Sequence, residues 1–206
     1  MEELLTIFNE KRCKIGVASR EDVHIKGYWH ETFQCWFIDK ENGLDYIYLQ
    51  KRCEDKKDFP NLFDITAAGH LLSTETAKDG IREIKEELGI DVKFHELRSI
   101  GVMNDIIETP DIIDKEWANV YVYNVKDTDK FLLQQEEVAG IVKVKLEDFV
   151  DLCFSKKQSI HVLGFGNTHS DQPTIIDQHI SLADIVPHSA EYLQKVCAKI
   201  IEDSSQ

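Results

Sequence analysis

The feature that most constrains the fold of this chain is a helical pattern over residues 75–88. Apolar side chains recur there at spacings of three and four, at Ile81, Ile84 and Leu88. Gly89 follows directly, in the position where a glycine commonly ends a helix. We therefore predict an amphipathic helix, whose apolar face must pack against another layer of the domain.

The same stretch carries three clustered carboxylates. Glu83, Glu86 and Glu87 stand at positions i, i+3 and i+4, so a helix places them together on one face. Like charges this close repel, and a hard cation resolves the conflict, because Mg²⁺ prefers oxygen ligands and commonly bridges carboxylates to substrate phosphates. The alternative is a solvated helix with pairs such as Arg82 to Glu86, the more common meaning of such a run taken alone.

Strand-like patterns occupy much of the remaining chain. β-branched and aromatic residues alternate over residues 32–38, 46–49, 65–68, 92–102 and 120–125. Asn42-Gly43 indicates a hairpin turn between the first two of these stretches. Strands combined with a few helices predict an α/β or α+β domain.

Two further helical patterns cover residues 146–153 and 189–202. Ser189, after Pro187, is a suitable first residue for the second helix. We predict a turn inside a hairpin at Gly164-Phe165-Gly166-Asn167, because no following helix with a lysine completes a phosphate loop. No repeat or linker interrupts the chain, so we expect a single domain over residues 1–206.

Composition argues against several classes of function. A formal net charge of -14 disfavours nucleic acid as a partner, since that binding depends on clustered Lys and Arg. No stretch approaches the ~18 apolar residues of a membrane span, so we expect no membrane association. The five cysteines are scattered and fit a reduced, cytoplasmic protein. A homodimer is one assembly that these features allow.

The segment from Gly69 to Ile90 resembles the Nudix box. That pattern is Gly, five residues, Glu, seven residues, Arg-Glu, an aliphatic residue, any residue, Glu-Glu, any residue, Gly and an aliphatic residue. Residues 82–90 match every fixed position, and Gly69 with Glu75 matches the first half. The chain departs from the pattern in one respect, because six residues rather than seven separate Glu75 from Arg82.

The resemblance implies a Nudix-type α/β/α sandwich with a mixed β-sheet and a hydrolase that depends on Mg²⁺ or Mn²⁺. Its substrate would be a small molecule with a diphosphate linkage, such as a nucleoside diphosphate linked to another moiety. Glu83 and Glu87 would be the main metal ligands, and Glu86 a further ligand or the base that activates water. Arg82 would hold a carboxylate in place.

Two other acidic positions carry accessory roles in this interpretation. Glu75 pairs with Arg82 if the helix begins early, because seven residues are close to two helical turns. Otherwise the loop is reshaped and Thr74 takes the position of the usual glutamate. Glu137, with its neighbour Glu136, is a candidate base outside the box, against the alternative of two exposed loop acids.

The chain also resembles type I isopentenyl diphosphate isomerase, which shares the Nudix fold. The similarity lies in Trp29-His30-Glu31-Thr32-Phe33, Gln50-Lys51-Arg52, Lys56, Pro60 and Ala68-Gly69-His70. It implies a metal-binding set of His24, His30 and His70, and substrate contacts from Gly69, His70, His30 and Arg52, with Lys51 and Lys56 as further phosphate contacts.

The isomerase needs a cysteine directly before the Gly-His step, where this chain has Ala68. Alanine carries no exchangeable proton, and the helix retains all the Nudix glutamates. Both differences favour hydrolysis. Isomerase-like chemistry and a non-catalytic nucleotide sensor with the Nudix fold remain the two alternatives, and the glutamates argue against the second.

Overall fold

The computed structural model describes residues 3–166 and 174–204. Its strands are β1 Leu4–Phe8, β2 Lys14–Ser19, β3 Trp29–Glu41, β4 Leu44–Arg52, β5 Phe63–Ile65, β6 Ala67–His70, β7 Arg98–Glu108, β8 Ile113–Asn124, β9 Val138–Lys145, β10 Ile160–Gly166 and β11 Thr174–Ile180. Its α-helices are α1 Arg20–Lys26, α2 Arg82–Leu88, α3 Leu146–Cys153 and α4 Ala190–Ser204. None of these helices is long and apolar enough to cross a membrane.

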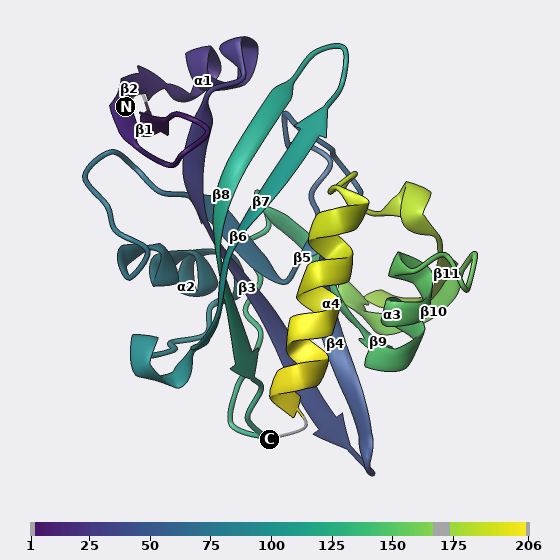
Figure 1. Ribbon diagram of the computed structural model, residues 1–206. Coiled ribbons are helices and arrows are strands. Elements are labelled where there is room, and N and C mark those ends of the chain that lie inside the picture. The colour runs from purple at the N-terminus through teal and green to yellow at the C-terminus, as the bar shows by residue number, and fades with distance from the viewer. Residues whose placement is uncertain (1–2, 167–173, 205–206) are drawn as a thin grey trace.

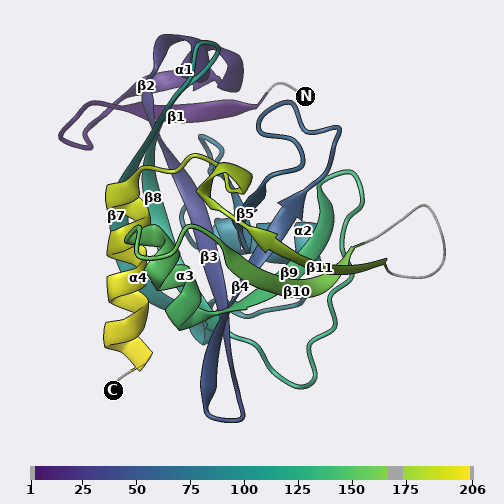
Figure 2. The ribbon, with the colours of Figure 1, turned by 90° about the vertical axis from the view of Figure 1, so that its right-hand side faces the viewer.

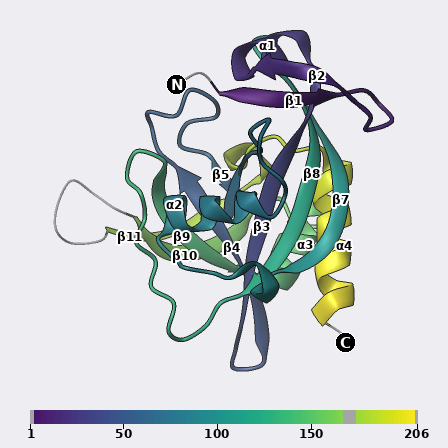
Figure 3. The same cartoon turned by 90° about the vertical axis from the view of Figure 1, so that its left-hand side faces the viewer.

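The strands form one mixed sheet around the long strand β3. Most neighbours are antiparallel, but β3 and β8 run parallel. Helix α2 lies on one side of the sheet and helices α3 and α4 lie on the other (Figures 1, 2 and 3). The predicted α/β/α arrangement with a mixed sheet is confirmed.

Each face of the sheet has its own apolar core. The core beneath α2 includes Phe33, Phe37, Ile84, Leu88 and Tyr121. The core beneath α3 and α4 includes Trp36, Val120, Phe149, Tyr192 and Val196. Strand β3 supplies both cores, because alternate side chains of a strand point to opposite faces.

The sheet opens beside β3, at a place that the sequence pattern did not show. The predicted strand 65–68 is in fact two strands separated at Thr66, with β5 on β4 and β6 on β3. The Thr66 hydroxyl donates to the Tyr48 carbonyl at 2.5 Å and accepts from the Phe37 amide at 3.0 Å. These bonds hold the chain where it passes from one strand to the other.

Other predicted elements are found, some with the predicted limits and some with altered ones. The Asn42-Gly43 hairpin joins β3 to β4, with φ of 52° and 79° at the two turn residues. Helix α3 occupies the predicted residues, and Ser189 caps α4 by accepting from the Tyr192 amide at 3.2 Å. The predicted strand 92–102 begins only at Arg98, after a short 3₁₀ turn at Phe94–Glu96.

The predicted helix over residues 75–88 is shorter than its pattern. Regular α-helix begins at Arg82, after a 3₁₀ turn at Asp79–Ile81. Asp79 accepts from the Thr76 amide at 2.9 Å and from the Thr76 hydroxyl at 2.7 Å. The Asp79 carboxylate thus caps the Thr76 amide as at a helix N-terminus, and residues 75–78 stay outside the regular helix.

The predicted turn at residues 164–167 was wrong for residues 164–166, which the structure describes. Gly164 and Gly166 lie within β10, which pairs with both β9 and β11. A Cβ atom at Gly164 would collide with the Ile141 carbonyl oxygen, so glycine serves close strand packing there. Asn167 lies outside the described residues.

Candidate active site

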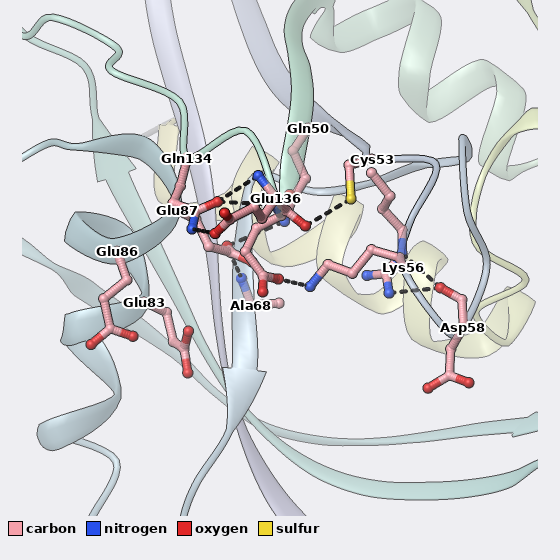
Figure 4. Close-up of polar contacts among 12 residues, drawn as sticks. Gln50, Cys53, Lys56, Asp58, Ala68, Glu83, Glu86, Glu87, Gln134 and Glu136 are labelled. Atoms are coloured by element: carbon pink, nitrogen blue, oxygen red, sulfur yellow. Dashed lines mark hydrogen bonds and ion pairs between the residues drawn. The ribbon is translucent and has the colours of Figure 1, made fainter. Parts of the chain in front are cut away.

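A cavity of about 690 Å³ lies where the sheet opens. Its wall combines residues that are far apart in sequence, including Arg52, Lys56, Gly69, His70, Glu83, Glu86, Glu87, Glu116, Glu137 and His188. Glu83, Glu86 and Glu87 come from α2, and Lys56 faces them from residues 53–62 (Figure 4). The fold therefore brings most of the predicted site residues into one cavity.

The three helix glutamates differ in exposure. Glu87 is buried, and its Oε2 accepts from the Ala68 amide at 3.2 Å and from Gln50 Nε2 at 3.3 Å (Figure 4). The Glu83 side chain is 13% exposed and that of Glu86 58% exposed. Glu83 and Glu87 thus form the inner pair, while Glu86 lies at the rim.

Burial makes the charged forms of the inner pair costly. It raises the pKa of Glu83 to about 7, against a lowering effect of Arg82. It raises the pKa of Glu87 to about 8, and the Glu83 charge adds to this shift, while Lys56 opposes it. A bound cation would remove this cost, because an opposite charge favours the ionised carboxylate.

Gly69 leaves room for the Glu83 carboxylate at the end of β6. A Cβ atom at Gly69 would overlap the Glu83 carboxyl group. The glycine of the first half of the motif is therefore required here by the close approach of a side chain from α2.

Arg82 is itself part of the cavity wall and links the carboxylates there. It donates to Glu75 Oε1 at 2.7 Å and to Glu86 Oε2 at 2.9 Å, and it forms an ion pair with Glu83 at 2.7 Å. Glu75 also accepts from the Leu72 amide at 2.8 Å. The Glu75–Arg82 pair therefore forms although only six residues separate the two. Glu75 lies in a loop, however, so the predicted early start of the helix was wrong.

A second group of potential ligands lies beside His70. The rings of His24, His30 and His70 are 5.0–5.5 Å apart between centroids. Within the described residues their buried Nε2 atoms have no hydrogen-bond partner, although Asp114 Oδ1 lies 3.4 Å from His30 Nε2 and 3.7 Å from His24 Nε2. Both the three histidines and the set His30, Asp114 and Glu116 are spaced to hold a metal ion.

The protonation of this group suits a metal site. Burial lowers the pKa of His30 to about 4 and that of His70 well below its ordinary value, so both rings are neutral. Burial also raises the pKa of Asp114 to about 6, although the nearby His24 opposes this shift. Metal binding needs neutral imidazole, and the rings of His30 and His70 meet that condition.

Three residues predicted to contact substrate, Arg52, His30 and Lys51, make other contacts in the folded chain or lie outside the cavity wall. Arg52 donates to Asp64 at 2.9 Å and twice to the Asp58 carbonyl, at 3.2 Å and 2.8 Å, so internal bonds engage its guanidinium. His30 is fully buried and does not line the cavity. Lys51 lies over the Phe63 ring, with Nζ 5.9 Å from the centroid.

Comparison with known proteins identifies the family. The family model described as NUDIX domain matches residues 28–162. The chain belongs to the Nudix hydrolase family. An uncharacterized Nudix hydrolase of Clostridium acetobutylicum is 36% identical over 203 residues, which cover 98% of each chain.

Two further Nudix-fold relatives show different aspects of the similarity. An isopentenyl-diphosphate Delta-isomerase of Photorhabdus laumondii is 27% identical over 59% of this chain and 67% of its own length. The crystal structure of a Deinococcus radiodurans protein superposes with a TM-score of 0.57 at 18% identity, over 75% of this chain and 91% of its own. The second comparison supports the Nudix fold alone.

Sequence reasoning missed three polar residues near the Nudix helix. Gln50 contacts Glu87 from β4, and Asp114 and Glu116 lie beside the histidines on β8. The two acids alternate along the chain, which places them on one face of a strand. The predicted strand began only at residue 120, so this signal lay outside it.

Proposed function

We propose that this protein is a divalent-cation-dependent hydrolase that cleaves a diphosphate linkage in a nucleoside diphosphate linked to another moiety, or in a related diphosphate. The observation that carries the proposal is the inner pair Glu83 and Glu87, two carboxylates held largely out of water at one cavity wall. Carboxylates of this kind fit Mg²⁺, or Mn²⁺, together with phosphate oxygens.

Each residue of the Nudix helix has a role in this proposal. Glu83 and Glu87 hold the cation, and Glu86 at the rim is a further ligand or a base. Arg82 fixes the Glu83 and Glu86 carboxylates through its ion pairs. When bound, the cation neutralises charge on the diphosphate and lowers the pKa of a coordinated water.

The histidine group supports a second metal position beside the first. His24, His30 and His70 offer imidazole nitrogens, which suit Zn²⁺ better than Mg²⁺. Asp114 and Glu116 complete an oxygen and nitrogen donor set. On β6, Gly69 lies against Glu83 and the adjacent His70 belongs to the histidine group, and both would contact the bound substrate.

Removal of metal should abolish hydrolysis. Excess chelator is expected to reduce the release of phosphate or nucleotide to background in a screen of diphosphate compounds, and added Mg²⁺ should restore it. The reason is that the buried carboxylates lack a cation that could stabilise charge on the diphosphate. Full turnover in chelator would contradict the proposed mechanism, and metal-dependent nucleotide binding without turnover would favour the sensor alternative.

Isomerase activity is the second candidate function, supported by the histidine group and the isomerase relatives. We expect none, because Ala68 stands where the isomerase has its cysteine and cannot exchange a proton. The assay is proton NMR of isopentenyl diphosphate incubated with the protein and either Mg²⁺ or Mn²⁺. Formation of dimethylallyl diphosphate by the unmodified protein would contradict this expectation.

Three further expectations remain predictions. We propose one domain over residues 1–206, a cytoplasmic location and a homodimer as a compatible assembly. Limited proteolysis, fractionation of cells and light scattering of the purified protein test these three in turn.

A further inference from the structure

Two loops meet across the mouth of the cavity. Residues 53–62 follow β4, and residues 125–137 precede β9. Their bases are joined by Cys53, whose amide donates to the Glu137 carbonyl at 3.1 Å and whose thiol donates to the Glu136 carbonyl at 2.8 Å. Further out, the Lys56 ammonium forms an ion pair with the Glu137 carboxylate.

The Nudix helix fixes the position of Glu137. The Gln134 amide donates to the Glu87 carbonyl at 2.9 Å, which ties this loop to the end of α2. The Gln134 side-chain oxygen then accepts from the Glu136 amide at 2.7 Å and from the Glu137 amide at 3.1 Å. The Glu137 backbone is therefore held at a constant place relative to the inner pair.

Lys56 is held much less firmly than its neighbour Arg52. The Lys56 and Glu137 side chains are 23% and 43% exposed, and a partly exposed pair of this kind is weak and exchanges readily. Lysine also carries its charge on a flexible stem. The three internal bonds of Arg52 give it no comparable freedom.

The Lys56 charge acts on the inner carboxylates as well as on Glu137. Lys56 lines the same cavity as Glu83 and Glu87 and faces them from residues 53–62 (Figure 4). Its positive charge opposes the rise in their pKa values that burial causes. Its ammonium therefore occupies a region where a metal cation would also be attracted. A diphosphate entering the same cavity would present oxygens that compete with Glu137 for this ammonium.

We propose that Lys56 moves from Glu137 to the diphosphate when substrate binds, and that this exchange uncovers Glu137 as the base for the attacking water. The proposal rests on the proposed hydrolase function. The oxygen of the water forms a bond to phosphorus, and Glu137 takes one proton from that water. The bridging P–O bond breaks, and its electron pair leaves with the departing phosphate.

The exchange predicts opposite effects of one substitution on two ligands. In Lys56→Met, Mn²⁺ binding should tighten about threefold, because a competing positive charge near the carboxylates is gone. Binding of methylenediphosphonate, a diphosphate that cannot be hydrolysed, should weaken about tenfold in the presence of Mn²⁺ because a phosphate contact is lost. Electron paramagnetic resonance measures the first and titration calorimetry the second.

Lys143→Met is the matched control. Lys143 forms an ion pair with Glu41, the two side chains are 26% and 42% exposed, and neither residue lines the cavity. Both affinities should stay at the wild-type value in this variant. A purely structural pair at Lys56 would give the same pattern as this control, and that result would overturn the proposal.

Glu137→Gln tests the base. On a substrate found in the screen, kcat should fall by about 100-fold or more, the usual contribution of a positioned base, while KM stays near the wild-type value. Lys56→Met should instead act mainly on KM. A wild-type kcat in Glu137→Gln would overturn the proposed base.

If the protein is not a hydrolase, the same measurements would give a different set of results. Wild-type protein would then bind Mn²⁺ and methylenediphosphonate, with the opposite shifts in Lys56→Met, but would turn over no compound in the screen. That result would retain the ion-pair exchange and overturn hydrolysis together with the role of Glu137 as a base.

Discussion

Glu83→Gln and Glu87→Gln are each expected to lower turnover by more than about 100-fold, since loss of an outer-shell partner of a metal alone typically costs ~10–100-fold. Both residues belong to the inner pair, and glutamine removes the negative charge that would hold the cation. Steady-state rates on a substrate from the screen measure the loss. Wild-type rates in both variants would show that this helix is not the active site.

Without metal, Glu83→Gln and Glu87→Gln should be at least as stable as the wild type. The difference in stability between variant and wild type should depend on pH. Burial raises the pKa of Glu87 from 4.5 to about 8, so the folded protein binds this proton more tightly than the unfolded chain. The resulting stabilisation is present below the unfolded pKa and is lost as pH rises through about 8. Glutamine does not titrate, so the melting temperature of Glu87→Gln should exceed the wild-type value above about pH 8.

Glu75→Gln is the control for these variants. Glu75 holds Arg82 from the loop before α2 and is 15% exposed, but it belongs to the ion-pair network rather than to the inner pair. We expect a milder loss of turnover than for Glu83→Gln. An equal loss would show that the Arg82 network matters as much as the proposed ligands. Thermal unfolding with chelator separates either effect from a loss of folded protein.

The sequence predicted those parts of the fold and site that depend on local spacing. Residues 82–90 specify a helix with carboxylates on one side, and Gly89 ends it with a φ of 73°. The Asn42-Gly43 turn and α3 follow from equally local signals. Each of these features involves neighbours along the chain, so residue identity and spacing were sufficient.

The remaining features depend on contacts between distant segments. Arg52 appeared free to bind phosphate, but its partner Asp64 and the Asp58 carbonyl become visible only in the folded chain. The break in the predicted strand 65–68 likewise depends on bonds from Thr66 to Tyr48 and Phe37, which lie on other strands. No periodicity in the sequence distinguishes these outcomes from the alternatives.

His188 is the most consequential residue that the sequence did not indicate. It precedes α4, and its ring nitrogens lie 2.6 Å from Asp105 and 2.9 Å from Asp64. The three side chains come from three separate elements and are at most 7% exposed. Burial alone would lower the pKa of His188, but hydrogen bonds to the two aspartates raise it to about 10.

His188→Leu is expected to lower the free energy of unfolding by about 3–5 kcal/mol, because removing one partner leaves buried carboxylates uncompensated. Urea unfolding measures the loss. His161→Leu is the matched control, since His161 and Asp177 form a pair that is 49% and 63% exposed. That variant should stay within about 0.5 kcal/mol of the wild type.

The pH dependence of this loss follows from the direction of each pKa shift. The stabilisation from His188 is fully present below its unfolded pKa of 6.5 and is lost as pH rises through about 10. Burial alone would raise the pKa values of Asp64 and Asp105, but their contacts with His188 lower both below 3.8. The stabilisation from these two carboxylates is therefore lost only in acid, as pH falls below 3.8. The difference between wild type and His188→Leu should therefore be largest between about pH 4 and pH 6.5 and shrink toward pH 10. A difference that does not change with pH would mean that His188 is not held as a cation between the two aspartates.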